Sequence, residues 1–303
     1  MLTVIVPYYN REQYLPRTLN SIAESGYRPI HLILVNNHST DSSKQICEEF
    51  AEKHRSDDFD VILADELEGG AAKARNRGLV LCDTPFVYFF DSDDLFDKDF
   101  LQEIMPELNE SVDLIAVPTN VSVGGKQPVP RKFRQTARPA AQILTGHLST
   151  QAMVFRTDFL RQIGGWNDSL PMWNDWELGV RVLDAKPRMK WLTKRSFHTV
   201  FLHPDSLTGS SFSQRIDSMR KAMKAVNNET QGRYQKPLFF RMEFITGNLL
   251  KENNREEADE NKKLTRRWFP DRSVITDLFG WLIRRYVAWG GRGSWRLALW
   301  LCN

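Results

Sequence analysis

Hydrophobic and polar residues follow two alternating patterns over the first third of the chain. Short apolar runs that are typical of buried strands alternate with segments whose apolar residues recur at helical spacing. Strands that alternate with helices predict parallel βαβ units joined by right-handed crossovers. The expected strands are 3–6, 31–35, 61–64 and 86–90, and the expected helices between them are 13–25, 42–54 and 71–81.

The pattern changes after the fourth expected strand. A helix over 97–109 and a strand over 114–117 are still expected, but residues 118–139 are rich in proline, glycine and basic residues, which favours a hairpin or a mobile loop. From residue 213 to the end the pattern is helical. Between these regions the sequence predicts helices at 140–144, 157–163 and 174–185 and strands within 189–202.

Composition and charge fit a folded protein and exclude other classes. Of the 303 residues, 41% are hydrophobic, which is enough for a core and argues against disorder. This length suits one large α/β domain with appendages, or two smaller domains. The net charge is only +3, so the composition gives no sign of a nucleic-acid partner.

The cysteines and the N-terminus indicate a compartment. Cys47, Cys82 and Cys302 are scattered and odd in number, which predicts a reducing compartment rather than a disulfide framework or a zinc site. The chain begins with a strand-like run rather than a signal peptide, and no segment has the roughly 18 uninterrupted apolar residues of a spanning helix. We therefore expect a cytoplasmic protein, or one that is peripheral on the inner face of a membrane.

A cluster of acidic residues follows the most apolar of the expected strands. Residues 86–90 are apolar, and Asp91, Asp93 and Asp94 come directly after them. Open α/β sheets bind ligands at the carboxyl ends of their strands. Carboxylates so close together repel one another unless a cation lies between them, so the cluster predicts a divalent metal site that holds a phosphate-bearing ligand. The alternative is a solvated acidic turn before the next helix.

Motifs elsewhere in the chain support a ligand site at the strand ends. They are the first strand with its end (4–10), the end of the second strand (35–41), a basic helical segment (74–79), a Gly-Gly-Trp turn (163–167) and an acidic helix start (174–177, with Arg181). Any one of them alone would be weak. Together with the acidic cluster they resemble, in order and spacing, the motifs of the family 2 glycosyltransferases, and the resemblance covers about residues 2–211.

The family has the GT-A fold, so the resemblance implies an α/β protein with a Rossmann-like sheet that binds a nucleotide sugar. We expect this donor-binding half at 1–118, an acceptor-binding half at 119–212 and a C-terminal helical extension at 213–303. The resemblance also implies an inverting glycosyltransferase. It would move a sugar from a nucleotide sugar, most simply a UDP-sugar, to a saccharide or lipid-linked acceptor in polysaccharide or glycolipid synthesis.

Several residues are expected to bind the donor because of their positions in the family motifs. The segment from Pro7 to Asn10 would flank the base and ribose, and Asn37 stands where the family usually has an aspartate that faces the uracil imide. The guanidinium of Arg75 could grip the diphosphate. The expected donor-binding residues are Pro7, Tyr9, Asn10, Asn37, Arg75, Asp91 and Ser92.

The resemblance also implies a bound Mg²⁺ or Mn²⁺. Asp93 would be a direct ligand, and Asp91 would reach the ribose or the metal. His203 falls where some relatives place a residue that contacts the metal or the diphosphate, although a lone histidine is more often structural. A cation there would lower the barrier, because the nucleoside diphosphate leaves with negative charge on its phosphates.

The expected catalytic base is Asp175, which stands at the position of the base in the family. A carboxylate that takes the proton of an acceptor hydroxyl typically contributes about 10²–10⁴-fold in rate. Trp166, Trp173 and Trp176 are expected to surround Asp175 and to contact the acceptor, since tryptophan faces suit the apolar faces of sugar rings. The structural alternatives are that Asp175 caps a helix and that Trp166 belongs to the core.

The chain departs from the family at two places. Asn36 and Asn37 replace the usual acidic pair, and an amide could face a base other than uracil, so dTDP and GDP stay open beside UDP. Asn174 replaces a frequent glutamate before the base. The alternative to an enzyme is therefore a non-catalytic nucleotide-sugar-binding partner subunit on the same fold. A nucleotidyltransferase is disfavoured, because the segment after the first strand has no glycine.

The C-terminal segment carries a separate pattern. Residues 284–303 contain four arginines and no acidic residue, and four of the nine tryptophans lie within 281–303. Arginine, tryptophan and leucine together are typical of a helix that lies on anionic lipid. Such a membrane-surface contact through 281–303 would fit a lipid-linked acceptor. The alternative is a helix that packs on the domain or on a second subunit in a homodimer.

Overall fold

The computed structural model describes residues 1–202 and 211–302. Its centre is a seven-stranded sheet in the order β3-β2-β1-β4-β8-β5-β9. The four strands at one side run parallel, as expected from the alternating strand and helix signals. They are β1 (Leu2–Tyr8), β2 (Ile30–Asn36), β3 (Phe59–Asp65) and β4 (Phe86–Phe89).

The strand next to β4 runs the other way. β8 (Met153–Arg156) is antiparallel to both β4 and β5 (Leu114–Ala116), and β9 (Met189–Trp191) extends the sheet parallel to β5. β8 was not predicted, because its four residues lie between two helical patterns and show no alternation of their own. The fold is nevertheless the expected mixed α/β architecture, with a parallel core sheet and a helical C-terminal part.

Both faces of the sheet are covered, which explains why its strands are apolar without alternation. Val4 and Val6 of β1 pack with helices α1 (Leu15–Ala23) and α2 (Ser43–His54) on one face. Ile5 points to the other face, toward α3 (Ala71–Leu81). A Cβ on Gly78 of α3 would lie 2.4 Å from Ile5 Cγ2, so glycine permits this close contact of helix and strand.

Of the expectations for 97–139, the helix needs adjusting and the hairpin is confirmed. The helix expected over 97–109 is shorter, α4 (Phe100–Ile104) followed by the 3₁₀ turn η1 (Met105–Glu107), since Pro106 has no N–H for a continued α-helix. Residues 118–139 include the expected hairpin, formed by β6 (Thr119–Val123) and β7 (Val129–Pro130). With β10 (Phe197–Leu202), which is parallel to β6, they form a second sheet of three strands.

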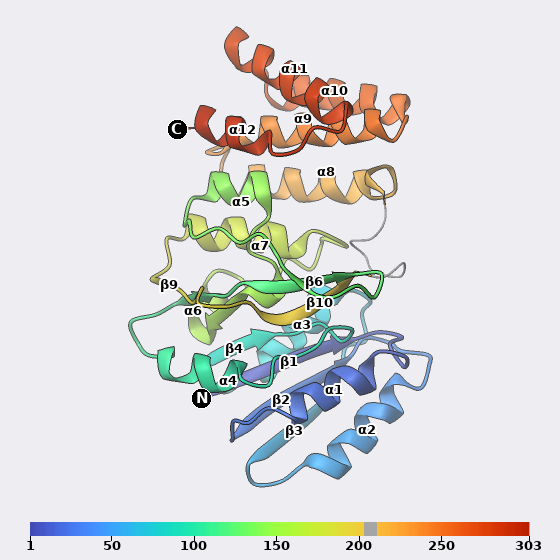
Figure 1. Ribbon diagram of the computed structural model, residues 1–303, viewed down its shortest axis with the longest axis vertical. Helices are drawn as coiled ribbons and strands as arrows, with labels where there is room; N and C mark the ends of the chain where they lie inside the picture. The colour runs from blue at the N-terminus through green and yellow to red at the C-terminus, as the bar shows by residue number, and fades with distance from the viewer. Residues whose placement is uncertain (203–210, 303) are drawn as a thin grey trace.

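Helices build the rest of the molecule. α5 (Pro139–Thr145), the 3₁₀ turn η2 (Thr150–Ala152), α6 (Thr157–Gln162) and α7 (Asn174–Asp184) belong to the middle of the chain. Figure 1 shows α7 between the sheets and the C-terminal helices, which lie at the far end from β3, and it shows α5 level with the first of these helices. These are α8 (Phe212–Glu229), α9 (Gln235–Lys251), α10 (Arg255–Trp268), α11 (Val274–Ala288) and α12 (Trp295–Leu301).

The C-terminal helices share a hydrophobic core with α5 and α7. α9 is buried on most sides and contributes Leu238, Phe240 and Met242 to a cluster that also includes Trp176 of α7. None of the helices within the described ranges is both long and apolar enough to cross a bilayer. The division at residues 118 and 212 falls just after β5 and at the start of α8, and it stays a prediction.

Candidate active site

A cavity of about 800 Å³ lies at the carboxyl ends of β1, β2 and β4, where the sequence predicts the ligand. Its walls come from eight separate parts of the chain. They are the ends of the three strands, the start of α3, the turn before α7 together with Thr150, the end of β10, and α8. Among the expected donor-binding residues, the lining includes Pro7, Tyr9, Asn37, Arg75, Asp91 and Ser92.

Arg75 and Asp91 form the best-defined contact of the cavity. Arg75 Nη2 donates to Asp91 Oδ1 over 2.7 Å, and Arg75 Nη1 is 3.4 Å from Asn174 Oδ1 of α7. Only 7% of the Arg75 side chain is exposed, and its Cζ lies 4.5 Å from the centre of the Trp166 ring. The buried guanidinium therefore connects α3, the end of β4 and the start of α7 at one wall of the cavity.

The three carboxylates after β4 all line the cavity, but they differ in burial and in their partners. Asp91 and Asp93 face the cavity, and Asp93 Oδ2 is 3.5 Å from Arg11 Nε. Asp94 is buried, accepts from the backbone N–H of Phe201 over 2.8 Å and is hydrogen-bonded to Gln151. Burial raises the pKa of Asp94 well above its usual range, and the charges of Asp91 and Asp93 raise it further.

Asp175 faces the same cavity from the first turn of α7. Its Oδ1 accepts from the backbone N–H of Trp176 in the same turn over 2.8 Å, although the N-cap residue of the helix is Trp173. Burial raises the pKa of Asp175, while the charges of Arg131 and Arg75 oppose that rise. The residue before the helix, Trp173, has a φ of 61°, a conformation that is uncommon outside glycine and often found at functional sites.

The three expected acceptor-binding tryptophans differ in position. Trp173 lines the cavity, and the Arg241 guanidinium lies 4.9 Å from its ring centre. Trp176 is buried against α5, where its Nε1 donates to the backbone oxygen of Ile143 over 3.1 Å. Trp166 is 2% exposed beneath Arg75 and packs edge-on against Phe89. It is therefore a core residue, which was the structural alternative. Neither of these two is part of the cavity lining.

The asparagines near the strand ends are engaged with neighbouring loops. Asn37 Oδ1 accepts from the backbone N–H of Gly70 and Asn37 Nδ2 donates to the backbone oxygen of Glu68, each over 2.8 Å. Asn37 Nδ2 also donates to the backbone oxygen of Glu66 over 3.5 Å, so one acceptor site of the amide oxygen stays available for a base. Asn10 accepts from the backbone N–H of Thr40 over 2.8 Å and is not part of the cavity lining.

Sequence reasoning missed four residues of the site. Arg11 and Arg215 line the cavity, and Arg215 comes from α8, far along the chain in the helical extension. Thr150 and Gln151 come from η2, and Gln151 Nε2 donates to Asp91 Oδ2 over 2.8 Å. Arg11 directly follows a motif and could have been noticed, whereas the others depend on how distant elements pack.

Asp91 and Asp93 are the residues of the cavity that could bind a divalent metal. Over residues 1–202 and 211–302, no three His, Cys, Asp or Glu side chains converge as a metal-binding group. Mg²⁺ is commonly held by one or two carboxylates together with phosphate oxygens and waters, so two cavity-facing carboxylates suit a metal that arrives with a diphosphate. His203, the third expected ligand, lies outside the described residues.

Comparison with known families and curated proteins gives a consistent result. The sequence model of the family described as Glycosyl transferase family 2 matches residues 3–164. The minor teichoic acid biosynthesis protein GgaB of Bacillus subtilis is 27% identical over 205 residues, which are 65% of this chain and 22% of GgaB. The chain spans between 16% and 36% of the length of the first three curated relatives that it matches.

Solved structures show the same fold. Residues 1–349 of Staphylococcus aureus TarS in complex with UDP-GlcNAc superpose with a TM-score of 0.65 at 19% identity, covering 96% of this chain and 92% of that one. The mannosyltransferase PcManGT of Pyrobaculum calidifontis, in complex with GDP-Man and Mn²⁺, gives a TM-score of 0.59 at 16% identity, covering 98% and 82%.

Proposed function

Because the chain belongs to glycosyl transferase family 2, we propose that its cavity binds a nucleotide-sugar donor and that Asp175 acts as the base of an inverting sugar transfer. The observation that carries this proposal is the arrangement of three groups around one cavity. The Asp175 carboxylate, the Arg75 guanidinium and the Asp91–Asp93 pair all face it, from three elements that are distant in sequence.

The donor would lie with its diphosphate between the positive and the acidic groups. Arg75, Arg11 and Arg215 can donate to phosphate oxygens, and Arg75 is preorganised because Asp91 and Trp166 hold its guanidinium. Asp93 and Asp91 would hold a Mg²⁺ or Mn²⁺. Such an ion would offset the charge that accumulates on the leaving diphosphate.

Transfer needs a proton acceptor on the side of the incoming hydroxyl. In the proposed reaction the acceptor oxygen forms a bond to the anomeric carbon, its proton passes to Asp175, and the bond from that carbon to the phosphate oxygen breaks. A pKa raised by burial makes Asp175 a stronger base than an ordinary aspartate. Trp173, on the cavity wall beside Asp175, offers a face to the acceptor sugar.

The substrate class follows from the relatives. The TarS structure contains UDP-GlcNAc and GgaB acts in teichoic acid biosynthesis, so we assign a UDP-sugar as donor and a saccharide or lipid-linked polymer as acceptor. A lipid-linked acceptor would bring the enzyme to a membrane surface. The alternative, a partner subunit that binds a nucleotide sugar without transfer, keeps the cavity but makes no use of Asp175.

The experiment is a transfer assay with the purified chain, UDP-sugars or GDP-mannose, and polyol-phosphate or oligosaccharide acceptors. Release of nucleoside diphosphate that depends on the acceptor and is lost in Asp175→Asn supports the proposal. An Asp168→Asn variant, which removes an exposed carboxylate from the loop before α7, serves as the control and keeps activity. Donor binding with no release under any acceptor would favour the partner subunit.

A further inference from the structure

A second cavity, of about 260 Å³, lies among α9, α10 and α11, in the helical extension and apart from the residues of the donor cavity. Four basic residues and two acidic residues line it. Its volume is several times the roughly 30 Å³ that a water molecule occupies in the liquid, so a phosphate group with some of its water fits. The lining residues are Phe239, Glu243, Lys262, Thr265, Arg266, Arg272, Asp277, Trp281 and Arg284.

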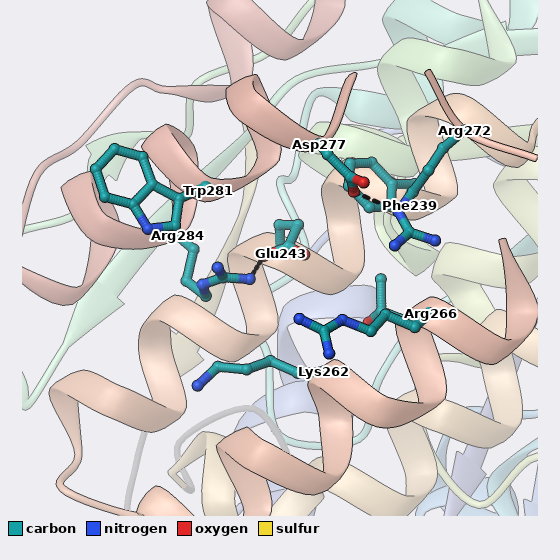
Figure 2. Close-up of a pocket in the computed structure, with 9 residues that line it drawn as sticks. Phe239, Glu243, Lys262, Arg266, Arg272, Asp277, Trp281 and Arg284 are labelled. Atoms are coloured by element: carbon teal, nitrogen blue, oxygen red, sulfur yellow. Dashed lines mark hydrogen bonds and ion pairs between the residues drawn. The ribbon is translucent and has the colours of Figure 1, made fainter. Parts of the chain in front are cut away.

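The four basic residues of this cavity outnumber its two acidic residues, so its lining carries a net positive charge. Arg284 Nη1 donates to Glu243 Oε2 over 2.6 Å, and Arg272 pairs with Asp277. Figure 2 shows these two pairs on one side, while Lys262 and Arg266 extend from α10 on the other. Lys262 contacts Asp259 of its own helix over 2.7 Å. Lys262 and Arg266 are one helical turn apart, so both can reach one anion.

The outer surface of α11 beside this cavity is apolar, contrary to the usual pattern of a surface helix. Its inner face packs tightly on α9, where a Cβ on Gly280 would lie 2.6 Å from the Phe239 ring. The outer face is exposed, with Val274 at 85% and Trp289, just beyond the helix, at 82%. The outer apolar face consists of Val274, Ile275, Leu278, Trp281, Leu282, Tyr286 and Trp289.

Trp281 belongs to both features, since it lines the cavity and is part of the outer apolar face. Tryptophan and tyrosine beside aliphatic residues are typical of protein surfaces at the level of lipid headgroups. Not every tryptophan of residues 281–303 belongs to the outer apolar face. Trp295 lies partly buried beneath Arg134, with 3.5 Å from Arg134 Cζ to its ring centre, whereas Trp300 is exposed.

The distribution of charge identifies the partner of this surface. Residues 261–303 contain nine lysines and arginines and two aspartates, while the whole chain has a net charge of only +3, so the rest of the chain is net acidic. A second copy would bring two positive surfaces together, which is unfavourable. An anionic bilayer offers phosphate groups at the depth of the basic cavity and hydrocarbon for the apolar face.

We propose that the basic cavity of α9, α10 and α11 takes the phosphate headgroup of an anionic lipid while the outer apolar face of α11 lies in the membrane interface. This surface goes beyond the transfer reaction and does not depend on it. It also differs from a contact through the C-terminal segment alone, because Lys262 and Arg266 precede that segment.

The test measures sedimentation of the full chain with vesicles of phosphatidylcholine, with and without phosphatidylglycerol. Lys262→Gln/Arg266→Gln should weaken binding to the anionic vesicles about 10- to 30-fold, since each basic residue near an anionic surface contributes roughly a factor of five. The control Lys263→Gln/Arg267→Gln removes two charges one residue further along the same helix, outside the cavity lining, and should change binding less than about threefold. Leu278→Gln/Leu282→Gln on the outer face should also weaken binding.

Several results would overturn this assignment. The first is that the wild-type chain does not bind anionic vesicles. The second is that the two charge variants lose vesicle binding equally. The third is that soluble glycerol phosphate stabilises the chain although it binds no vesicles. A dimer that forms with increasing concentration and is broken by Leu278→Gln/Leu282→Gln, in a chain that ignores vesicles, would assign the face to a second copy. The nucleotide-induced shift in melting temperature should stay unchanged in all three variants, which separates this test from that of sugar transfer.

Discussion

The guanidinium of Arg75 and the carboxylate of Asp91 are 2.7 Å apart, and this contact joins α3 to the end of β4 at one wall of the cavity. Asp91 Oδ2 accepts a second hydrogen bond from Gln151, so neither carboxylate oxygen of Asp91 is without a partner. Because Arg75 also stacks over Trp166, its position is determined before any ligand arrives. In the proposed function, this preorganised cation would meet the diphosphate of the donor.

Replacing Arg75 with glutamine should weaken both the fold and the site. The change leaves Asp91 without its charged partner and removes the contact over Trp166, which should lower the free energy of unfolding by about 1–3 kcal/mol. It should also weaken nucleotide binding, as followed by calorimetry. Arg77→Gln, on the exposed side of α3, is the matched control and should change neither quantity. Equal nucleotide affinity in the two variants would contradict the role of Arg75.

Asp175→Asn should reduce kcat by about 10²–10⁴-fold with little change in donor affinity, because the amide keeps the shape but cannot take a proton. In the wild type, activity should fall toward acid as Asp175 becomes protonated. The midpoint of this fall in activity should lie at a pH above 3.8, the usual pKa of an aspartate, since burial raises the pKa of Asp175. Stopped assays over a pH series measure both effects. A variant with wild-type kcat, or an acid limb that persists in the variant, would remove Asp175 from this role.

Asp93→Asn should reduce the dependence of nucleotide binding on divalent metal. Asp93 faces the cavity and can give a carboxylate oxygen to the ion, whereas an amide oxygen is a weaker ligand. Titrations of nucleoside diphosphate with and without Mn²⁺ should show a metal-dependent gain in the wild type and a smaller one in the variant. Asp99→Asn, which changes an exposed carboxylate outside the cavity lining, serves as the comparison and should leave the metal dependence unchanged. Should wild-type affinity be the same with and without metal, the metal part of the proposal fails.

The sequence predicted the core of the fold because a buried parallel strand has a simple signature. The apolar runs at 31–35 and 86–90 correspond to β2 and β4, and the motifs after them meet at one cavity as expected. The family resemblance is confirmed by the match over residues 3–164. Asp175 lies in the first turn of α7 and lines this cavity, while its role as the base stays a prediction.

What the sequence did not predict depends on packing between distant elements. Gln151 and Arg215 reach the site only because η2 and α8 fold against it, and no local pattern records that contact. A sequence also shows that a tryptophan is present but not which way its ring points. Trp166 and Trp173 flank one turn, yet one is buried beneath Arg75 and the other lines the cavity.

Glu229 should make stability depend on pH. Burial and the neighbouring Glu177 raise the pKa of Glu229 to about 7 against the opposing charge of Arg181. The folded chain then holds this proton more tightly than the unfolded chain between about pH 4.5 and 7, so its contribution to stability is present at acid pH and is lost as the pH rises through 7.

Glu229→Gln keeps the uncharged form at every pH. The variant should therefore melt at a higher temperature than the wild type at pH 8, and the difference should vanish below about pH 4.5. Thermal melts over a pH series check this, with the exposed Asp168→Asn as control. A difference of the same size at all pH values would mean that titration of Glu229 is not its cause.

The central claim is that the cavity at the strand ends binds a nucleoside diphosphate. Melting temperatures of the wild type and of Arg75→Gln, with UDP, dTDP, GDP, CDP and ADP and with and without Mn²⁺, test it most directly. We predict that UDP with Mn²⁺ raises the wild-type melting temperature, since a ligand that binds only the folded state stabilises it, and that Arg75→Gln loses most of this rise. No rise with any nucleotide, or an equal rise in the variant, would contradict the claim.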